Sequence, residues 1–341
     1  MKTRFLRTAL AASAAAGLTM GLVACSGDGA TDANADGTGA DGDAVTIVTS
    51  TKVWADVAEA VVGDAEGVKI QPIIASNDVD PHSYQPTAAD MATVEQADVL
   101  LAGGGHYDAW LTEAASSDSA AIILTAIEGD GFDGHGEEGH GEEGHDHTGN
   151  DDAGHDHAEE GDDHAGHDDA DHDHAGHDHE VNEHIWYSTD AVKSVASTLA
   201  SEVNSHWDLG ASDETVVKRL DEIDDRKKDL PAATTAQTHP LADDIIAGTK
   251  ITDDTPQGYR KSTLSESEPA AADVAAMLEL IESGNLDFLI DAPQTRDHVS
   301  ERLVKAAQAK GLRIVNVYES PNANENFFDL YERILDDLEQ E

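Results

Sequence analysis

The sequence predicts an α/β protein whose strands form mostly parallel sheets flanked by helices. Short apolar, β-branched runs alternate with stretches of helical periodicity from Val45 to Leu124, and such alternation is typical of βαβ units. A second alternating set runs from Pro269 to the C-terminus. A charge-dense helical stretch, residues 213–229, lies between the two sets. We therefore expect two α/β lobes, with this helix as a rigid connector.

The first set contains four apolar runs and three amphipathic stretches. From Trp54 to Val62 the apolar residues recur at the i, i+3, i+4, i+7 spacing of a helix. Thr87 and Asp90 form a Thr-x-x-Asp pattern close to a capping box, which favours a helix start. The predicted strands are Val45–Val48, Val68–Ile74, Val99–Leu101 and Ile122–Leu124, and the predicted helices are Trp54–Val62, Thr87–Ala97 and Tyr107–Ala115.

Folding is expected to resume at His184 after a long polar segment. Two helices, Asp190–His206 and Asp213–Asp229, come before the second set. Pro269 favours a helix start because proline is well tolerated at the first helical position. The second set is predicted to contain helices Pro269–Glu282, His298–Ala309 and Glu325–Leu338, and strands Leu286–Ile290 and Leu312–Val317.

We expect residues 1–24 to be a secretory signal. Lys2, Arg4 and Arg7 precede the apolar run Ala9–Val23, which is too short for a membrane-spanning helix. The run ends in Leu-Val-Ala-Cys, which resembles the lipobox of bacterial lipoproteins.

In lipoproteins the cysteine of this motif becomes the lipidated first residue. Cys25 is the only cysteine of the 341 residues. The resemblance therefore implies an extracytoplasmic protein, attached to the cell membrane by lipid on Cys25. Residues 25–43 are Gly, Ala, Asp and other small or polar residues without apolar periodicity, and predict a disordered tether.

The charge balance is strongly acidic. The chain has 70 Asp and Glu against 20 Lys and Arg, a formal net charge of −50. Nucleic acid is excluded as a partner, because neutralising phosphates requires positive charge. Cations are the natural partners of such a surface.

Residues 133–183 predict a disordered insertion within the N-terminal lobe. They hold twenty carboxylates, no Lys or Arg, and no large aliphatic or aromatic residue apart from Val181, so they cannot bury a core. Imidazoles and carboxylates bind Zn²⁺, Ni²⁺ and Cu²⁺. Ordering each ligating residue costs about 1–2 kcal/mol, so several weak auxiliary sites are expected. Their candidate ligands are His135, His140, His145, His147, His155, His157, His164, His167, His172, His174, His177 and His179.

A different kind of site is predicted at His82. This residue lies in Asp-Pro-His-Ser-Tyr, after the predicted strand Val68–Ile74. The carboxyl end of a strand in a parallel sheet is where ligands bind. Pro81 restricts the backbone before His82, and Asp80 is an expected hydrogen-bond partner of the imidazole.

The Asp-Pro-His-x-Tyr motif resembles the first metal motif of the zinc and manganese solute-binding proteins of ABC importers. His184, in Asn-Glu-His-Ile-Trp-Tyr, resembles the second motif, in which the family has Asp-Pro instead of Asn-Glu. His239, in Thr-His-Pro-Leu, falls where the third ligand opens the second lobe. Glu319 follows a predicted strand, where relatives have Asp or Glu. The resemblance covers the chain from Val45 onward and implies that His82, His184, His239 and Glu319 bind the metal.

The family's fold consists of two α/β lobes joined by a long rigid helix, with the metal in the cleft. The resemblance implies an N-terminal lobe at 44–210, a connecting helix at 211–232 and a C-terminal lobe at 233–341. Three imidazoles and one carboxylate form a closed tetrahedral ligand set, which favours Zn²⁺ over Mn²⁺. The implied partners are an ABC permease and its ATPase, and we expect the protein to be a monomer.

Two other functions stay open on the sequence alone. A zinc hydrolase needs three protein ligands, an open position for water and a general base. The sequence has no His-Glu-x-x-His, and four candidate ligands leave no open position, so we expect no enzymatic activity. The other alternative is a surface lipoprotein that sequesters metal or acts as an adhesin without a transporter partner.

Overall fold

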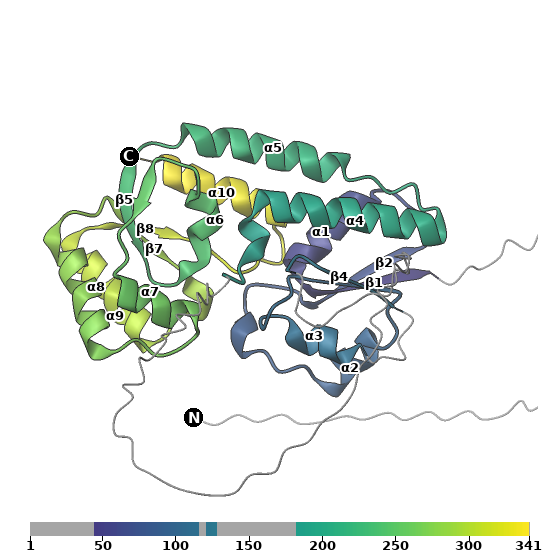
Figure 1. Ribbon diagram of the computed structural model, residues 1–341, viewed down its shortest axis with the longest axis horizontal. Helices are drawn as coiled ribbons and strands as arrows, with labels where there is room; N and C mark the ends of the chain where they lie inside the picture. Colours follow the sequence, from purple (N-terminus) through teal and green to yellow (C-terminus); the bar gives the residue numbers. More distant parts are fainter. Residues whose placement is uncertain (1–43, 116–120, 128–181, 341) are drawn as a thin grey trace, which may run out of the picture. The chain divides into compact units, whose positions relative to one another are not determined.

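The computed structural model describes residues 44–115, 121–127 and 182–340, all within one compact unit (Figure 1). The predicted signal, the tether with Cys25, and the twelve histidines from His135 to His179 lie outside the described residues. Among the described helices, none combines the length and apolarity needed to cross a membrane.

The N-terminal lobe is built on four parallel strands in the order β2-β1-β3-β4. Helix α1 packs on one face of this sheet, and α2 and α3 cover the other (Figure 1). Successive side chains of β3 point to opposite faces, so Val99 and Leu101 join the core under α1, while Leu100 joins the core under α3. The elements are β1 Val45–Thr51, α1 Lys52–Val62, β2 Val68–Ile74, α2 Ala88–Val94, β3 Val99–Ala102, α3 Ala109–Ala114 and β4 Ile122–Thr125.

The C-terminal lobe repeats this arrangement with the strand order β6-β5-β7-β8, again entirely parallel. Phe288 and Ile290 of β7 pack in the same core as α10, whereas Leu289 packs with α8 and α9. The elements are β5 Ala233–Gln237, α6 Asp243–Ile246, β6 Ile251–Asp253, α7 Gln257–Leu264, α8 Ala271–Ser283, β7 Phe288–Asp291, α9 His298–Lys310, β8 Arg313–Asn316 and α10 Phe327–Glu339.

Two long helices, α4 (Thr189–Trp207) and α5 (Glu214–Asp229), carry the chain from the first sheet to the second. Helix α5 packs against α1 and α4 of one lobe and against α10 of the other. One hydrophobic cluster accordingly contains Ile47 of β1, Leu220 of α5 and Leu335 of α10. The lobes therefore share a continuous core along the connecting helix.

The predicted α/β class with two mostly parallel sheets is confirmed, and every predicted strand and helix is present with ends shifted by at most three residues. The expected capping box is also present, since Thr87 Oγ1 accepts the Asp90 N–H and the Asp90 carboxylate accepts the Thr87 N–H. The sequence patterns did not predict the segment from β5 to α7.

Candidate metal centre

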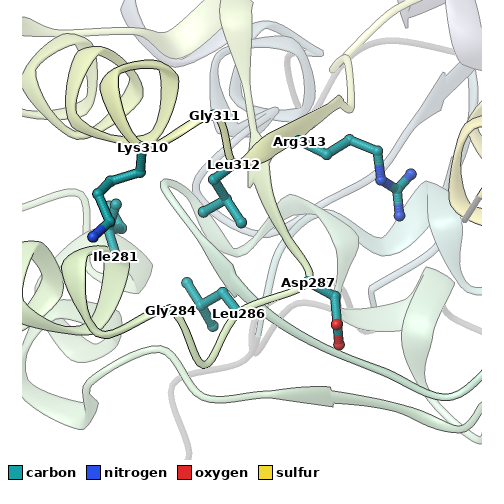
Figure 2. Close-up of a pocket in the computed structure, with 8 residues that line it drawn as sticks. All are labelled: Ile281, Gly284, Leu286, Asp287, Lys310, Gly311, Leu312 and Arg313. Atoms are coloured by element: carbon teal, nitrogen blue, oxygen red, sulfur yellow. The ribbon is translucent and has the colours of Figure 1, made fainter.

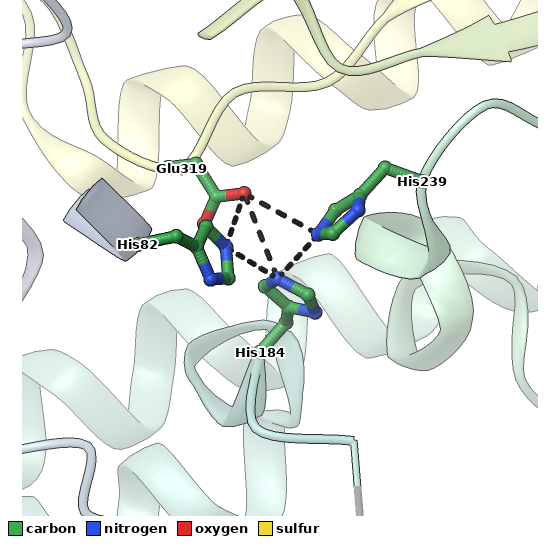
Figure 3. A group of neighbouring side chains, drawn as sticks. All are labelled: His82, His184, His239 and Glu319. Atoms are coloured by element: carbon green, nitrogen blue, oxygen red, sulfur yellow. Dashed lines mark hydrogen bonds and ion pairs between the residues drawn. The ribbon is translucent and has the colours of Figure 1, made fainter. Parts of the chain in front are cut away.

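Four polar side chains, two from each lobe, converge on one point (Figure 3). His82 lies in the 3-10 turn Pro81–Ser83 after β2, and His184 directly precedes the turn Ile185–Tyr187. His239 follows β5, and Glu319 follows β8. The carboxyl ends of parallel strands lie at one edge of their sheet, and these loops face each other there. The structure thus brings together all four residues that the sequence resemblance suggested.

The ligand atoms of this cluster lie within 4.8 Å of one another. His184 Nε2 is 3.3 Å from His82 Nε2 and 3.0 Å from His239 Nε2. Glu319 Oε1 lies 3.4, 3.6 and 4.0 Å from the Nε2 atoms of His82, His184 and His239, respectively. Glu319 is fully buried and His184 is nearly so, which shields the cluster from water.

The donor set fits a small divalent cation. Three imidazole lone pairs aimed at one point repel each other unless a proton or a metal ion lies between them. Ligands about 2.0–2.1 Å from a tetrahedral Zn²⁺ stand roughly 3.3–3.4 Å apart, close to the spacings in the cluster. The arrangement can therefore hold one tetrahedral ion with three nitrogen donors and one oxygen donor.

His82 is held by carboxylates on both ring nitrogens. Its Nδ1 lies 2.5 Å from Glu266 Oε1, and its Nε2 faces Glu319. Burial lowers the pKa of His82, but the hydrogen bonds to Glu266 and Glu319 outweigh it and raise this pKa to about 10.

The expectation that Asp80 holds the imidazole was wrong. The Asp80 carboxylate instead accepts the backbone N–H of His82 and caps the 3-10 turn.

The two other imidazoles are neutral because they are desolvated. Burial lowers the pKa of His184 to about 3 and also lowers that of His239. Asn182 Oδ1 lies 2.6 Å from Nδ1 of His184, so this ring nitrogen donates and Nε2 keeps its lone pair for the cluster. Both residues are thus ready to coordinate a cation without losing a proton.

Glu319 stays ionised despite complete burial. Burial alone would raise its pKa, but the surrounding imidazoles, His184 first, hold it at about 2. Tyr107 donates from its hydroxyl to Glu319 Oε2 at 3.4 Å. The preceding carbonyl, that of Tyr318, accepts a 2.7 Å hydrogen bond from Tyr187, which fixes the loop that presents Glu319.

Gly105 serves the same site indirectly. The carboxylate of Glu183, the residue before His184, accepts the backbone N–H groups of His106 at 2.9 Å and Tyr107 at 2.7 Å. A Cβ on Gly105, which has φ +66°, would lie 2.7 Å from that carboxylate. Glycine is needed here so that Glu183 can join the loop of Tyr107 to the turn that carries His184.

Sequence reasoning missed Glu266 and Tyr107 as members of this site. Each contacts a residue of the cluster that is distant in the sequence, and neither belongs to a local motif. The departure of Asn182 from the family motif did point to the surroundings of His184.

A separate cavity of about 400 Å³ lies at the end of the second sheet that is opposite to the histidine cluster (Figure 2). Gly284 and Gly311, which end α8 and α9, line it together with residues just before β7 and β8. It therefore lies at the amino ends of these strands, away from the histidine cluster.

Comparisons with known proteins agree with this architecture. The chain matches the family of ZnuA, the periplasmic zinc-uptake complex component A, over residues 47–341. The manganese-binding lipoprotein MntA of Halalkalibacterium halodurans is 37% identical over 76 residues, which cover 22% of this chain and 24% of that protein. The chain thus matches only about a quarter of the length of this relative.

Solved structures show the same fold at low sequence identity. A crystal structure of ZnuA has a TM-score of 0.56 at 16% identity, covering 87% of this chain and 97% of that chain. The periplasmic zinc-binding protein TroA from Treponema pallidum has a TM-score of 0.58 at 14% identity, covering 86% and 97%. Because the family match spans both lobes, this chain belongs to the family of the periplasmic zinc-uptake complex component A.

Proposed function

We propose that this protein is the extracytoplasmic metal-binding component of an ABC importer and that its cargo is Zn²⁺. In this proposal His82, His184, His239 and Glu319 bind the ion, and the protein delivers it to a membrane permease powered by an ATPase. The observation that carries the proposal is the convergence of three imidazole nitrogens and one carboxylate oxygen from two lobes within 4.8 Å.

The chemistry of the donors supports zinc as the cargo. Mn²⁺ favours oxygen ligands, whereas imidazole suits Zn²⁺ well. The matched family and TroA are named for zinc and MntA for manganese, so both ions belong in the test. The ligands include no thiolate, which suits a carrier that must release its cargo.

Further parts of the proposal concern the cellular setting. Cys25 is the proposed site of lipid attachment to the outer side of the cell membrane. The proposed domains are a lobe at 44–210, a connecting helix at 211–232 and a lobe at 233–341. The protein is proposed to act as a monomer without enzymatic activity, and the histidines from His135 to His179 are proposed as weak auxiliary metal ligands.

The test is metal titration of the chain from residue 26 onward, which contains the whole compact unit. We expect one tight Zn²⁺ per protein, and Mn²⁺ should not displace it at equal concentration. His239→Ala should abolish tight binding, and His298→Ala is the matched control, because the His298 side chain is 76% exposed and lies outside the cluster. Tight binding that survives His239→Ala would exclude the proposed ligand set.

The transport role is tested in cells. A deletion strain should lose growth and zinc uptake when zinc is scarce, and the native gene should restore both while the His239→Ala gene should not. Wild-type zinc uptake in the deletion strain would instead indicate a metal-sequestering or adhesive lipoprotein.

A further inference from the structure

The loop between α7 and α8 carries a residue in an unusual conformation. Glu266 has φ +51°, in the left-handed region where a Cβ is crowded against the backbone. The other described non-glycine residue with positive φ is Asp208, which ends helix α4. Such outliers persist where the surrounding structure holds them, and they gather at functional sites.

Backbone and side-chain contacts brace this loop. The Glu266 N–H donates to Thr263 O at 3.3 Å, and Ser267 donates to Ser262 O from both its N–H, at 2.8 Å, and its hydroxyl, at 3.1 Å. These bonds hold the loop against the end of α7. The side chain of Glu266 therefore projects from a fixed base rather than from a free loop.

The Glu266 carboxylate reaches across to the other lobe. Its Oε1 lies 2.5 Å from Nδ1 of His82, which is 184 positions away in the sequence. The Glu266 side chain is 52% exposed, whereas that of His82 is 12% exposed. Glu266 thus stands at the solvent side of the cluster and contacts Nδ1 of the His82 ring.

The contact with Glu266 determines which ring nitrogen of His82 is available to bind a metal ion. A carboxylate on Nδ1 accepts the N–H of that nitrogen and leaves the lone pair on Nε2. Nε2 is the atom that faces His184 at 3.3 Å and Glu319 at 3.4 Å. On the N-terminal side, Asp80 bonds the His82 backbone and not its ring. Tyr107 of the same lobe packs edge-on against the ring, with 5.0 Å between centroids. Both carboxylates that bond the ring nitrogens, however, belong to the C-terminal lobe.

We propose that Glu266 is a positioning residue of the metal site, which orients the His82 ring from the opposite lobe and thereby slows release of the bound ion. This inference rests on the proposed function, because it concerns the same ion. Loss of an outer hydrogen-bond partner of a metal-binding histidine typically weakens metal affinity by about 10–100-fold.

The chain offers a matched control two residues further along the same loop. Glu268 carries the same charge, but its side chain is 74% exposed and lies 3.5 Å from the equally exposed His298. Removing it changes the net charge as removal of Glu266 does, without touching His82.

The experiment compares wild type with Glu266→Ala, Glu266→Gln, Glu266→Gly and Glu268→Ala, all in the chain from residue 26 onward. Zn²⁺ affinity is measured by chelator competition, and release is followed after mixing with excess chelator. We expect Glu266→Ala to weaken affinity and speed release by about tenfold or more. Glu266→Gln should recover part of both, because an amide oxygen can accept the same N–H. Glu268→Ala should stay within about twofold of wild type.

Two further readouts separate positioning from a general loss of structure. Glycine suits φ +51°, so Glu266→Gly removes the carboxylate without straining the loop and should still release zinc faster. In the zinc-loaded wild type, the His82 Nδ1–H should give a downfield NMR signal protected from solvent. Glu266→Ala should lose this signal, and Glu268→Ala should keep it.

Unchanged affinity and release in all Glu266 variants, or equal losses in Glu266→Ala and Glu268→Ala, would overturn the inference. Failure of the wild-type protein to bind one tight zinc would instead overturn the proposed function, so the two failures are distinguishable.

Discussion

The side-chain amide of Asn182 donates a 2.7 Å hydrogen bond to Asp243 Oδ2, and so joins the N-terminal lobe to α6 of the C-terminal lobe. The oxygen of the same amide faces Nδ1 of His184. One neutral side chain therefore orients a proposed ligand and bridges the lobes. The second metal motif of the family has Asp at the position of Asn182, which would place a second carboxylate beside Asp243. The pairing gives a physical reason for asparagine here.

The first prediction concerns this pair. Asn182→Asp should destabilise the metal-free protein by about 1–3 kcal/mol, because the donor to Asp243 is lost and two carboxylates meet. Asp243→Asn should also destabilise the protein, because Asp243 pairs with Arg260. The double variant should lose less than the sum of the two single losses, since an amide again faces a carboxylate. Denaturant unfolding of the four proteins of this double-mutant cycle gives the coupling energy. A coupling near zero would show that the two side chains act independently.

The second prediction concerns pH. The pKa of His82 is raised to about 10, so this ring carries a proton at neutral pH that a metal ion must displace. The pKa of His184 is about 3, so its ring loses no proton above pH 5. Zinc affinity should therefore rise about tenfold per pH unit from pH 6 to 9, with about one proton released per ion.

Zinc titrations at several pH values, in buffers of different ionisation enthalpy, measure both quantities. An affinity that levels off above pH 7 would mean that His82 titrates like an ordinary histidine. The same raised pKa gives the opposite trend without metal. The His82 proton stabilises the metal-free fold fully below pH 6.5, and this contribution should be lost as the pH rises toward 10.

The third prediction separates the two populations of histidine. Deleting residues 134–180 removes all twelve histidines from His135 to His179 and leaves the described residues intact. The variant should lose several weak zinc equivalents and keep the one tight equivalent. Calorimetric titration of both proteins resolves the two classes. Loss of the tight equivalent would mean that the insertion supplies a ligand to the main site.

The family resemblance was enough to predict the four clustered residues. His82 and His184 lie in short, recognisable motifs, whereas His239 and Glu319 were assigned by their positions in the second lobe. The partners of these residues were harder to predict. Glu266 meets His82 across 184 positions, and only the packing of the two lobes brings them together. Asp80 lies close to His82 in the sequence, as a partner of its ring would. Its carboxylate instead accepts the backbone N–H of His82 and caps the 3-10 turn.

Local sequence patterns also failed to predict strand β5. Its sequence, Ala-Thr-Thr-Ala-Gln, has no large apolar residue and gave no strand signal. The strand is nevertheless central in its sheet, between β6 and β7, and Thr235 is fully buried. The Thr235 hydroxyl bonds the Phe288 carbonyl at 3.1 Å, which satisfies its polar group in the core. Small residues suit a strand that is packed on both faces, but this context is invisible in a five-residue window.

The fourth prediction concerns the contact between α1 and α10. The Asp56 carboxylate accepts the Phe327 N–H at the start of α10 at 2.8 Å and pairs with Lys52 at 2.6 Å. Asp56 is 5% exposed, and burial raises its pKa, although Lys52 and the Phe327 N–H oppose the rise. This side chain therefore satisfies a helix end that belongs to the other lobe.

Asp56→Ala leaves the Phe327 N–H buried without an acceptor and should reduce the free energy of unfolding by about 1–3 kcal/mol. Asp56→Asn keeps an acceptor oxygen and should retain more of the stability. Glu59→Ala, on the exposed side of the same helix, should change the stability by less than about 0.5 kcal/mol. Denaturant unfolding of the metal-free proteins provides the comparison. If Asp56→Ala unfolds no more easily than Glu59→Ala, the two lobes are held by the apolar core along α5 and α10 without help from this bond.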